Sequence, residues 1–264
     1  MKINTGCFPG GKTKALTMSY DDGRKADEKL VGIFNQYGIK GTFHLNSALF
    51  DREDYVDASE IKELYKGHEI SCHSAHHPWL ERIPKNAVLT ELISDKEALE
   101  KLAGYPVRGM SYPYGTYDAD VINIAKTVGL EYSRTTKSTM GFNVPEDFMQ
   151  WHPTCHHRDA IQMIDKFLNY DRGGLNLFYV WGHSYEFNYN NNWELIEEFC
   201  RKMSGKDDVW YATNIEIYDY FNAMKNIRMA VDCSSAYNPS AVDVWLSIDS
   251  MPVKIPAGEV VKLK

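Results

Sequence analysis

The stretch Ala15-Leu16-Thr17-Met18-Ser19-Tyr20-Asp21-Asp22-Gly23 joins a short apolar segment to two carboxylates and a glycine. The length and composition of the apolar segment predict a buried strand that ends near Tyr20. Asp and Gly dominate turns, so the carboxylates taken alone are better explained by a simple turn than by a catalytic site. A second polar run, His73-Ser74-Ala75-His76-His77, follows the predicted strand Glu69–Cys72 in the same way. Together the two runs predict a functional site where strands end.

The residue types in these two runs are those of a hydrolytic metal site. A divalent transition metal takes imidazole nitrogens and a carboxylate oxygen, and a hydrolytic site leaves one coordination position open. Asp22, His73 and His77 supply that set, with His76 as a competitor for the second imidazole. Asp21 is left over, beside the site and able to accept a proton from water. The runs therefore predict a metal-dependent hydrolase.

Short apolar segments alternate with longer amphipathic ones along most of the chain. The predicted strands are Ala15–Tyr20, Gly41–Leu45, Glu69–Cys72, Val107–Ser111, Leu130–Arg134, Leu175–Trp181 and Val209–Ala212. The segments with helical spacing are Lys25–Tyr37, Ile61–Lys66, Asn86–Leu102, Asp118–Val128, Ala160–Tyr170, Asn192–Met203 and Ile215–Lys225. This alternation predicts an α/β protein with a parallel sheet covered by helices. About seven such units favour a parallel (β/α)7-type barrel, with its closure left open.

The polar motifs fall where predicted strands end. Asp21 follows the first strand, His73 the third, Pro113 and Tyr114 the fourth, and His183 the sixth. Parallel α/β proteins place their active sites at the carboxyl ends of the strands. We therefore expect these residues to meet at one edge of the sheet.

The pattern changes after Lys225. Ile227–Asp232, Val242–Ile248 and Val260–Leu263 have the composition of strands and are joined by turns rich in Pro, Asn and Gly. We expect a catalytic domain over residues 1–225 and a small antiparallel β extension over residues 226–264 that packs on it.

Composition argues against several classes of protein. The formal net charge is −7 and no cluster of Lys and Arg stands out, so a nucleic-acid partner is not expected. The five cysteines are an odd number and widely spaced, which predicts reduced thiols. The absence of an apolar leader and of an apolar run of about 18 residues predicts no membrane association and a cytoplasmic location, with a truncated secreted form as the alternative. The oligomeric state stays open.

The motifs resemble those of the metal-dependent polysaccharide deacetylases, the carbohydrate esterase family four that includes chitooligosaccharide and peptidoglycan deacetylases. Ser19-Tyr20-Asp21-Asp22-Gly23 looks like that family's Thr-Phe-Asp-Asp-Gly motif, and the histidine run fits its His-Ser/Thr-x-x-His motif, which selects His77 over His76. Ser111-Tyr112-Pro113-Tyr114-Gly115 aligns with its Arg-x-Pro-Tyr-Gly segment, and His183 follows an apolar strand like its late histidine. The resemblance runs from about Ala15 to Ala223 and implies an irregular parallel (β/α) barrel.

The resemblance also implies roles for the matching residues. One divalent ion is implied, with zinc expected and cobalt or nickel as alternatives. Asp21 would be the general base, His183 the general acid, and the Tyr114 backbone N–H an oxyanion donor. The implied metal ligands are Asp22, His73 and His77. The expected substrate contacts are Pro113, Tyr114, Trp151 and Tyr185.

The chain departs from the family pattern in its third motif. The arginine that orients the catalytic base in the family is replaced by Ser111. Arg108 is on the wrong register of the same strand. We expect Arg134, at the end of the fifth strand, to deliver a guanidinium from another direction, and the alternative is a surface arginine.

The fourth motif, Asp-x-x-Asp-Trp in many relatives, corresponds at best to Asp147-Phe148-Met149-Gln150-Trp151, with Gln150 in place of the second carboxylate. Trp151 either lines the pocket or packs in the core. We interpret the following segment, with His152, His156 and His157, as a rim loop with solvated histidines. Its alternatives are a fourth ligand, a substrate contact or an acid–base group. The sequence does not decide whether Glu186 is buried near His183 or exposed.

These features predict a metal-dependent hydrolase that removes an N- or O-linked acetyl group from a carbohydrate. One alternative is hydrolysis of a non-peptide C–N bond in a small non-sugar amide. Another is a catalytically weak carbohydrate-binding protein. The expected partner is an acetylated carbohydrate or a small amide.

Overall fold

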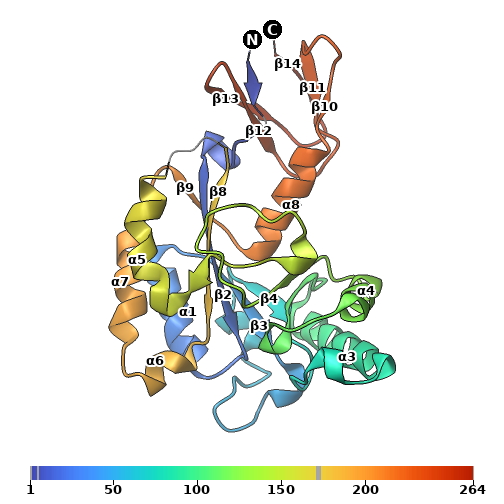
Figure 1. Ribbon diagram of the computed structural model, residues 1–264, viewed down its shortest axis with the longest axis vertical. Helices are drawn as coiled ribbons and strands as arrows, with labels where there is room; N and C mark the ends of the chain where they lie inside the picture. The colour runs from blue at the N-terminus through green and yellow to red at the C-terminus, as the bar shows by residue number, and fades with distance from the viewer. Residues whose placement is uncertain (1, 5, 171–173, 264) are drawn as a thin grey trace.

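A curved parallel sheet forms the centre of the protein, and the computed structural model describes residues 2–4, 6–170 and 174–263 (Figure 1). Its strands are β2 (Lys14–Asp21), β3 (Gly41–Leu45), β4 (Glu69–Cys72), β5 (Gly109–Ser111), β6 (Tyr132–Arg134), β7 (Cys155–His156), β8 (Asn176–Gly182) and β9 (Val209–Tyr211). The order is β6-β5-β4-β3-β2-β8-β7, and β9 also pairs with β2. Each of these pairings is parallel, which confirms the predicted α/β class.

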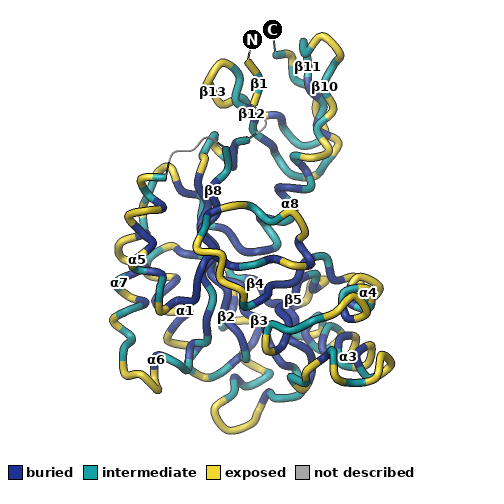
Figure 2. The backbone as a smooth tube through the Cα atoms, viewed as in Figure 1, coloured by how far each residue is buried: buried dark blue, intermediate teal, exposed yellow. Residues whose placement is uncertain are grey.

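Strand β2 is the central strand, and its sequence explains that position. Every residue from Lys14 to Asp21 is buried, as expected for a parallel strand that is covered on both faces. It pairs with β8 along almost its whole length and with β3 from Met18 to Asp21. Figure 2 shows this buried core within a more exposed outer layer. The first motif therefore begins inside the buried central strand, with Asp21 as its last residue.

Helices cover the outside of the sheet. They are α1 (Ala26–Tyr37), α2 (Ile61–Leu64), α3 (Lys85–Ala103), α4 (Ala119–Thr127), α5 (His157–Leu168), α6 (Tyr185–Tyr189), α7 (Trp193–Met203) and α8 (Asn214–Lys225). Helix α7 packs against both α1 and α5, and α3 packs against α4 and β4 (Figure 1). The short helix α6 was not predicted.

The segment from Trp151 to His156 joins the two edges of the sheet. The backbone of Trp151 donates to Ser133 at 3.0 Å and accepts from Thr135 at 3.0 Å, beside β6. A few residues later, Cys155 and His156 form β7 beside β8. The barrel is thus closed on this side by one irregular segment rather than by a long strand, which leaves an irregular barrel.

Trp151 lies in the core and not along the active-site cavity. Its side chain is 1% exposed and packs against Phe148, Tyr132 and Tyr179. This position does not support the predicted substrate contact at Trp151. It agrees with the alternative prediction, in which Trp151 packs in the core.

Two small antiparallel sheets lie at the end of the molecule that holds both termini (Figure 1). Strands β10 (Arg228–Met229), β11 (Ser235–Tyr237) and β14 (Val260–Lys262) form one sheet, and β1 (Ile3–Asn4), β12 (Val244–Ile248) and β13 (Met251–Ile255) form the other. The predicted C-terminal extension therefore includes an N-terminal strand, because β1 pairs with β12. The backbone N–H of Trp245 donates to the Tyr220 hydroxyl at 3.1 Å, which ties this part to α8.

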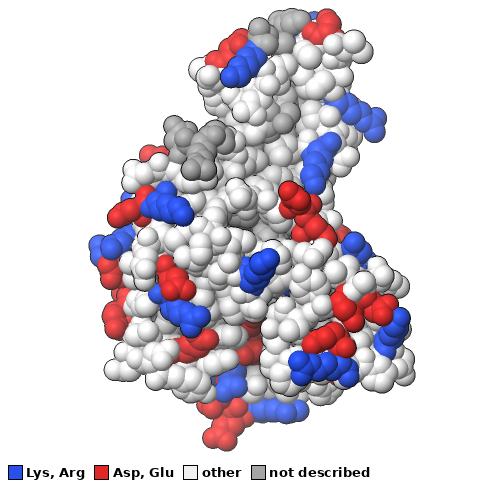
Figure 3. All heavy atoms as spheres, viewed as in Figure 1, with Lys and Arg blue, Asp and Glu red and all other residues white. Residues whose placement is uncertain are grey.

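The surface charges and the cysteines agree with what the composition predicts, namely reduced thiols and, among the described residues on the face shown in Figure 3, no large basic patch. Basic and acidic side chains are interspersed on the face shown in Figure 3. All five cysteines of the sequence are free thiols, and Cys233 alone among them is partly exposed. Within the described ranges, no helix is long and apolar enough to cross a membrane.

Candidate active site

The predicted site residues meet at the carboxyl edge of the parallel sheet. They surround a cavity of about 440 Å³, a volume within the usual range for small-molecule sites. Its lining residues are Asp21, Asp22, His73, His77, Tyr112, Tyr114, Thr136, Trp181, His183 and Tyr185. Strands far apart in the sequence thus deliver their terminal polar residues to one place.

Asp22, His73 and His77 form a compact group of metal-capable side chains. The Nε2 atoms of His73 and His77 lie 3.6 and 3.7 Å from Asp22 Oδ1. One ligand atom of each residue lies within 4.8 Å of the others. Distances of this size match the edges of a coordination polyhedron with bonds of about 2.0–2.2 Å. The exposed side of the group faces the cavity, which leaves room for water or substrate.

Left-handed backbone conformations aim these side chains. Asp22 has φ of 80°, His77 of 59° and Tyr114 of 59°. A residue other than glycine in this region is uncommon and costs about 1–3 kcal/mol where the surroundings impose it. At Asp22 the conformation breaks the alternation of β2, so consecutive carboxylates both reach the cavity. Concentration of this strain at one cavity is typical of a functional site.

The two histidines are joined by a tight turn and not by a helix. Ser74 has φ of 61°, and its hydroxyl accepts the His77 backbone N–H at 3.2 Å. The Asn46 side-chain amide donates to the carbonyls of His73 and Ser74 at 2.7 and 2.8 Å. These contacts fix the turn that brings both imidazoles toward Asp22. His76 points elsewhere, with its Nδ1 2.8 Å from Glu91.

The tautomer of His73 suits a metal ligand. Its Nδ1 lies 2.8 Å from the Ser111 carbonyl oxygen and 2.7 Å from the Ser111 hydroxyl. The carbonyl can only accept, so the proton resides on Nδ1 and the Nε2 lone pair points at Asp22. Burial lowers the pKa of His73 to about 3, which keeps this lone pair free. A second-sphere acceptor of this kind is typical of metal-binding histidines.

Asp21 is held in a single orientation by two donors. Arg134 Nη2 donates to Oδ2, and the Ser111 hydroxyl donates to Oδ1 at 3.1 Å. Ser111 on β5 and Arg134 on β6 are register partners. In the family that the motifs resemble, the arginine stands at the position of Ser111, so here the guanidinium comes from the neighbouring strand. Arg134 is 0% exposed, which excludes the alternative of a surface arginine. Arg108 instead pairs with Glu131 and Asp219.

The charges around Asp21 decide its protonation state. Burial alone would raise the pKa of this carboxyl, but Arg134 and His73 outweigh that effect and hold the pKa well below its usual range. Burial raises the pKa of Asp22, and the neighbouring carboxylate of Asp21 contributes to this rise. A bound cation would therefore stabilise the ionised form of Asp22, next to an Asp21 that is already ionised.

His183 follows β8 and lines the same cavity. Its Nδ1–H donates to Glu186 Oε1 at 2.7 Å, which leaves Nε2 for the cavity. Burial alone would lower the pKa of His183, but the hydrogen bond to Glu186 and the charge of Asp21 raise it. Tyr185 lies beside it, with ring centroids 5.2 Å apart. The cavity thus holds an ionised carboxylate and an imidazole whose pKa is raised by its carboxylate neighbours.

The predicted rim loop with solvated histidines is wrong for two of its three histidines. His156 and His157 are 6% and 3% exposed, because the closing segment places them beside β8, with which β7 pairs. Their Nε2 atoms each lie 3.2 Å from Glu186 Oε2. His152 contacts Thr135 through its Nδ1 at 2.6 Å and borders another cavity.

Aromatic rings frame the mouth of the cavity. The rings of Tyr114 and Trp79 stack at 3.7 Å with an angle of 7° between them, and these residues are 44% and 40% exposed. Tyr114 also touches His77 with its ring edge. Pro113 is buried in the turn beneath Tyr114 and does not line the cavity, so its predicted substrate contact is not supported by its position.

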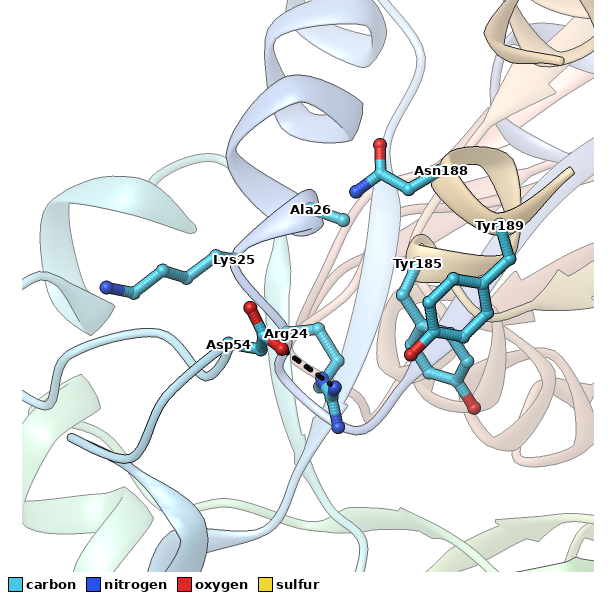
Figure 4. A pocket seen from close by; sticks show the side chains of 7 residues that line it. All are labelled: Arg24, Lys25, Ala26, Asp54, Tyr185, Asn188 and Tyr189. Atoms are coloured by element: carbon cyan, nitrogen blue, oxygen red, sulfur yellow. Dashed lines mark ion pairs between the residues drawn. The ribbon is translucent and has the colours of Figure 1, made fainter. Parts of the chain in front are cut away.

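A smaller cavity of about 100 Å³ adjoins the site through Tyr185, which lines both (Figure 4). Arg24, which follows the first motif, lies over the ring of Tyr55 at 4.4 Å and that of Tyr185 at 5.2 Å. Its Nη2 is 3.8 Å from Asp54. Tyr189 forms another wall of this cavity.

Comparisons with known proteins agree with this arrangement. Residues 9–133 match the family model for polysaccharide deacetylase. A peptidoglycan-N-acetylglucosamine deacetylase of Bacillus cereus is 24% identical over 182 residues, which cover 61% of this chain and 65% of the relative. Chitin deacetylase 1 of Cryptococcus neoformans is 29% identical over 138 residues, which cover 51% of this chain and 28% of the relative. This chain therefore matches less than two thirds of the length of either relative.

Solved structures share the fold. A putative polysaccharide deacetylase from Mycobacterium smegmatis aligns with a TM-score of 0.62 at 19% identity, over 85% of this chain and 96% of that chain. A family 4 carbohydrate esterase from Streptomyces lividans aligns with a TM-score of 0.52 at 14% identity, over 76% of this chain and 93% of that chain. The irregular parallel barrel of this chain is the fold of these proteins.

The Arg134–Asp21 pair predicts a measurable energetic coupling. Arg134→Met leaves a buried carboxylate without its cation, and we expect it to lower the free energy of unfolding by about 3–5 kcal/mol at neutral pH. Asp21→Asn combined with Arg134→Met should cost less than the sum of the single changes by at least about 1 kcal/mol. Urea denaturation measures both quantities.

Arg108→Met is the matched control, because it removes an arginine from a partly exposed ion pair and should cost about 1 kcal/mol or less. Strict additivity of the Asp21 and Arg134 changes would contradict the coupling.

Proposed function

We propose that this chain, which belongs to the polysaccharide deacetylase family, is a metal-dependent hydrolase that removes acetyl groups from a carbohydrate. The observation that carries the proposal is the cavity in which an ionised, doubly hydrogen-bonded Asp21 lies beside the Asp22, His73 and His77 group. This combination supplies both a site for a cation and a separate proton acceptor. A binding protein would have no use for the second carboxylate.

The donor set supports a bound divalent ion. Two imidazole nitrogens and one carboxylate oxygen converge on one point, and the His73 tautomer presents a lone pair to it. An ion bound there would polarise the acetyl carbonyl and acidify a water molecule. Zinc is our first choice, because imidazole and carboxylate ligands suit it, and cobalt and nickel accept the same ligands.

Asp21 is the proposed general base. Its carboxylate is ionised and cannot rotate freely, because Arg134 and Ser111 each hold one oxygen. A fixed carboxylate beside the cation site is suited to accept the proton of the attacking water. Its low pKa makes it a weak base, so the proton moves as the water attacks and not before.

His183 is the proposed general acid. Its Nδ1–H is bonded to Glu186, so a protonated ring carries its second proton on Nε2 at the cavity. As the C–N or C–O bond breaks, this proton passes to the departing amine or alcohol, and acetate is the other product. The Tyr114 backbone N–H, at the turn after β5, is the proposed donor to the oxyanion; the loss of such a donor typically costs about 100- to 1000-fold in rate.

The exposed aromatic rings favour a carbohydrate over a small non-sugar amide. Trp79 and Tyr114 offer flat apolar faces at the cavity mouth, and Tyr185 and Tyr189 continue such a surface into the adjoining cavity. Flat faces with polar tips match the apolar C–H faces and hydroxyl rims of pyranose rings. A small amide would leave most of this surface unused. Peptidoglycan- and chitin-like oligosaccharides are therefore the first substrates to test.

The division into residues 1–225 and 226–264 stays a proposal, in which the antiparallel sheets form an extension of the catalytic part. The cytoplasmic location is likewise a prediction.

The two proton-transfer groups give the direct test of the mechanism. Asp21→Asn and His183→Ala should each lower the rate of acetate release by about 100- to 10,000-fold, because each removes one proton-transfer group. Neither residue is a proposed ligand, so both variants should keep their metal content by elemental analysis. Acetate release is followed on N-acetylated glucosamine oligosaccharides. Activity of Asp21→Asn close to the wild type would exclude Asp21 as the base.

The carbohydrate assignment predicts a length-dependent effect at Trp79. Trp79→Ala removes an exposed stacking surface, so we expect KM to rise about 5- to 30-fold for an acetylated oligosaccharide, as for the loss of about 1–2 kcal/mol of binding. The KM for an acetylated monosaccharide should change much less. Steady-state kinetics on both substrates measure the difference. Faster turnover of simple amides than of any acetylated sugar would favour the small-amide alternative.

A further inference from the structure

A second cluster of titratable side chains lies directly behind His183. The Glu186 carboxylate contacts three imidazoles: Oε1 lies 2.7 Å from His183 Nδ1, and Oε2 lies 3.2 Å from Nε2 of both His156 and His157. The two deeper histidines are buried, and the Glu186 side chain is 26% exposed. The group formed by His156, His157 and Glu186 is compact enough to suggest either a second cation site or a hydrogen-bond cluster.

The backbone around these histidines favours the hydrogen-bond cluster. His156 Nδ1 accepts the Arg158 backbone N–H at 3.4 Å, so the proton of the neutral ring is on Nε2. His157 Nδ1 is buried, has no hydrogen-bond partner among the described residues, and lies so close to Gly182 that a Cβ there would overlap it. A proton on that nitrogen would be unsatisfied, at a cost of about 1–3 kcal/mol. Both rings therefore present Nε2–H donors and not metal-binding lone pairs.

The His157 ring cannot easily turn away from this arrangement. It stacks on Phe187 with ring centroids 4.3 Å apart and lies parallel to Tyr20 at 5.8 Å. Burial lowers its pKa to about 4, so it stays neutral near neutral pH. Burial alone would raise the pKa of Glu186, but the hydrogen bonds from His156, His157 and His183 hold it well below the usual range. The cluster thus contains one fixed carboxylate and two imidazole donors on its far oxygen.

We propose that Glu186, clamped by His156 and His157, is the positioning residue of the general acid His183. It keeps the Nδ1–H of His183 engaged, turns Nε2 to the cavity, and stabilises the imidazolium that gives its Nε2 proton to the leaving group. Helix α6 supplies this carboxylate three residues after His183, so the proposed acid and its partner are held on one short segment. The inference rests on the proposed function, because it names Glu186 as the residue that orients the proposed general acid His183.

The test uses the leaving group, because a purely structural role would not distinguish one leaving group from another. Glu186→Gln keeps the size of the side chain but removes its charge. We expect kcat for an N-acetylated glucosamine oligosaccharide to fall about 10- to 100-fold with KM within about twofold. For 4-nitrophenyl acetate, whose phenolate leaves without protonation, the same variant should stay within about threefold of the wild type.

Matched variants isolate the clamp. His157→Phe keeps an aromatic ring against Phe187 but removes the N–H donor, and it should show the same selective loss in a weaker form. Glu186→Asp should recover part of the amide activity, because it restores the charge with a shorter reach. Glu194→Gln, the same chemical change at an exposed position of α7, should leave both substrates unaffected.

Imidazole ¹⁵N chemical shifts give a readout that needs no turnover. The account predicts Nε2–H tautomers for His156 and His157 in the wild type and an engaged Nδ1–H for His183. Nδ1–H tautomers at His156 or His157, or a second metal equivalent that disappears in Glu186→Gln, would overturn the inference in favour of a cation site. Equal losses on the two substrates would overturn it in favour of a structural role. No deacetylation by the wild type with these tautomers intact would refute the proposed function instead.

Discussion

The ion pair between Asp21 and Arg134 is the interaction on which the site depends. Removing two charges from water costs several kcal/mol per ion, and the cost is recovered only where geometry and additional hydrogen bonds are good. Both groups are essentially inaccessible to solvent, and Ser111 satisfies the second oxygen of the carboxylate. The pairing fixes β6 against the end of β2 and keeps Asp21 ionised. Asp22 is then free to face the histidines, and the two adjacent carboxylates have different partners.

The two sides of the candidate site differ in whether they lie inside the part of the chain that matches the family model. The proposed base side, with Asp21, the candidate metal ligands and Tyr114, lies within the residues that match the family model. The proposed acid side, with His183 and Glu186, lies beyond them, directly after β8 and on α6. On the base side, the guanidinium that holds Asp21 comes from β6, beside Ser111. On the acid side, the carboxylate that contacts His183 comes from α6.

Much of this arrangement follows from the sequence, because it depends on local patterns and on one rule of topology. The apolar run before Asp21 specifies a buried strand, and parallel strands bring their carboxyl ends together, so the convergence of His73 and His183 is predictable. Arg134 could be named as a candidate, with a surface arginine as the alternative, because it ends the predicted strand after the one in which Ser111 stands at the position of the family's arginine. These inferences need only the order of strands and the identity of the residues that follow them.

Other features depend on contacts that leave no local signal. The segment after Trp151 has no strand or helix periodicity, yet it closes the barrel and buries His156 and His157. Helix α6 is too short for a 3.6-residue pattern, so the position of Glu186 could not be predicted. The pairing of β1 with β12 joins opposite ends of the chain, and its short strands carry little pattern of their own. In each case long-range packing decides the structure.

We propose that Asp22, His73 and His77 form a cation site while Asp21 stays free as the base. Elemental analysis of the purified wild type, Asp22→Ala and His76→Ala tests it most directly, after zinc or cobalt has been offered to each. The account predicts about one ion per chain in the wild type and in His76→Ala, whose imidazole is bonded to Glu91, and loss of the ion in Asp22→Ala. A wild type that binds no metal, or an Asp22→Ala variant that keeps it, would contradict the account.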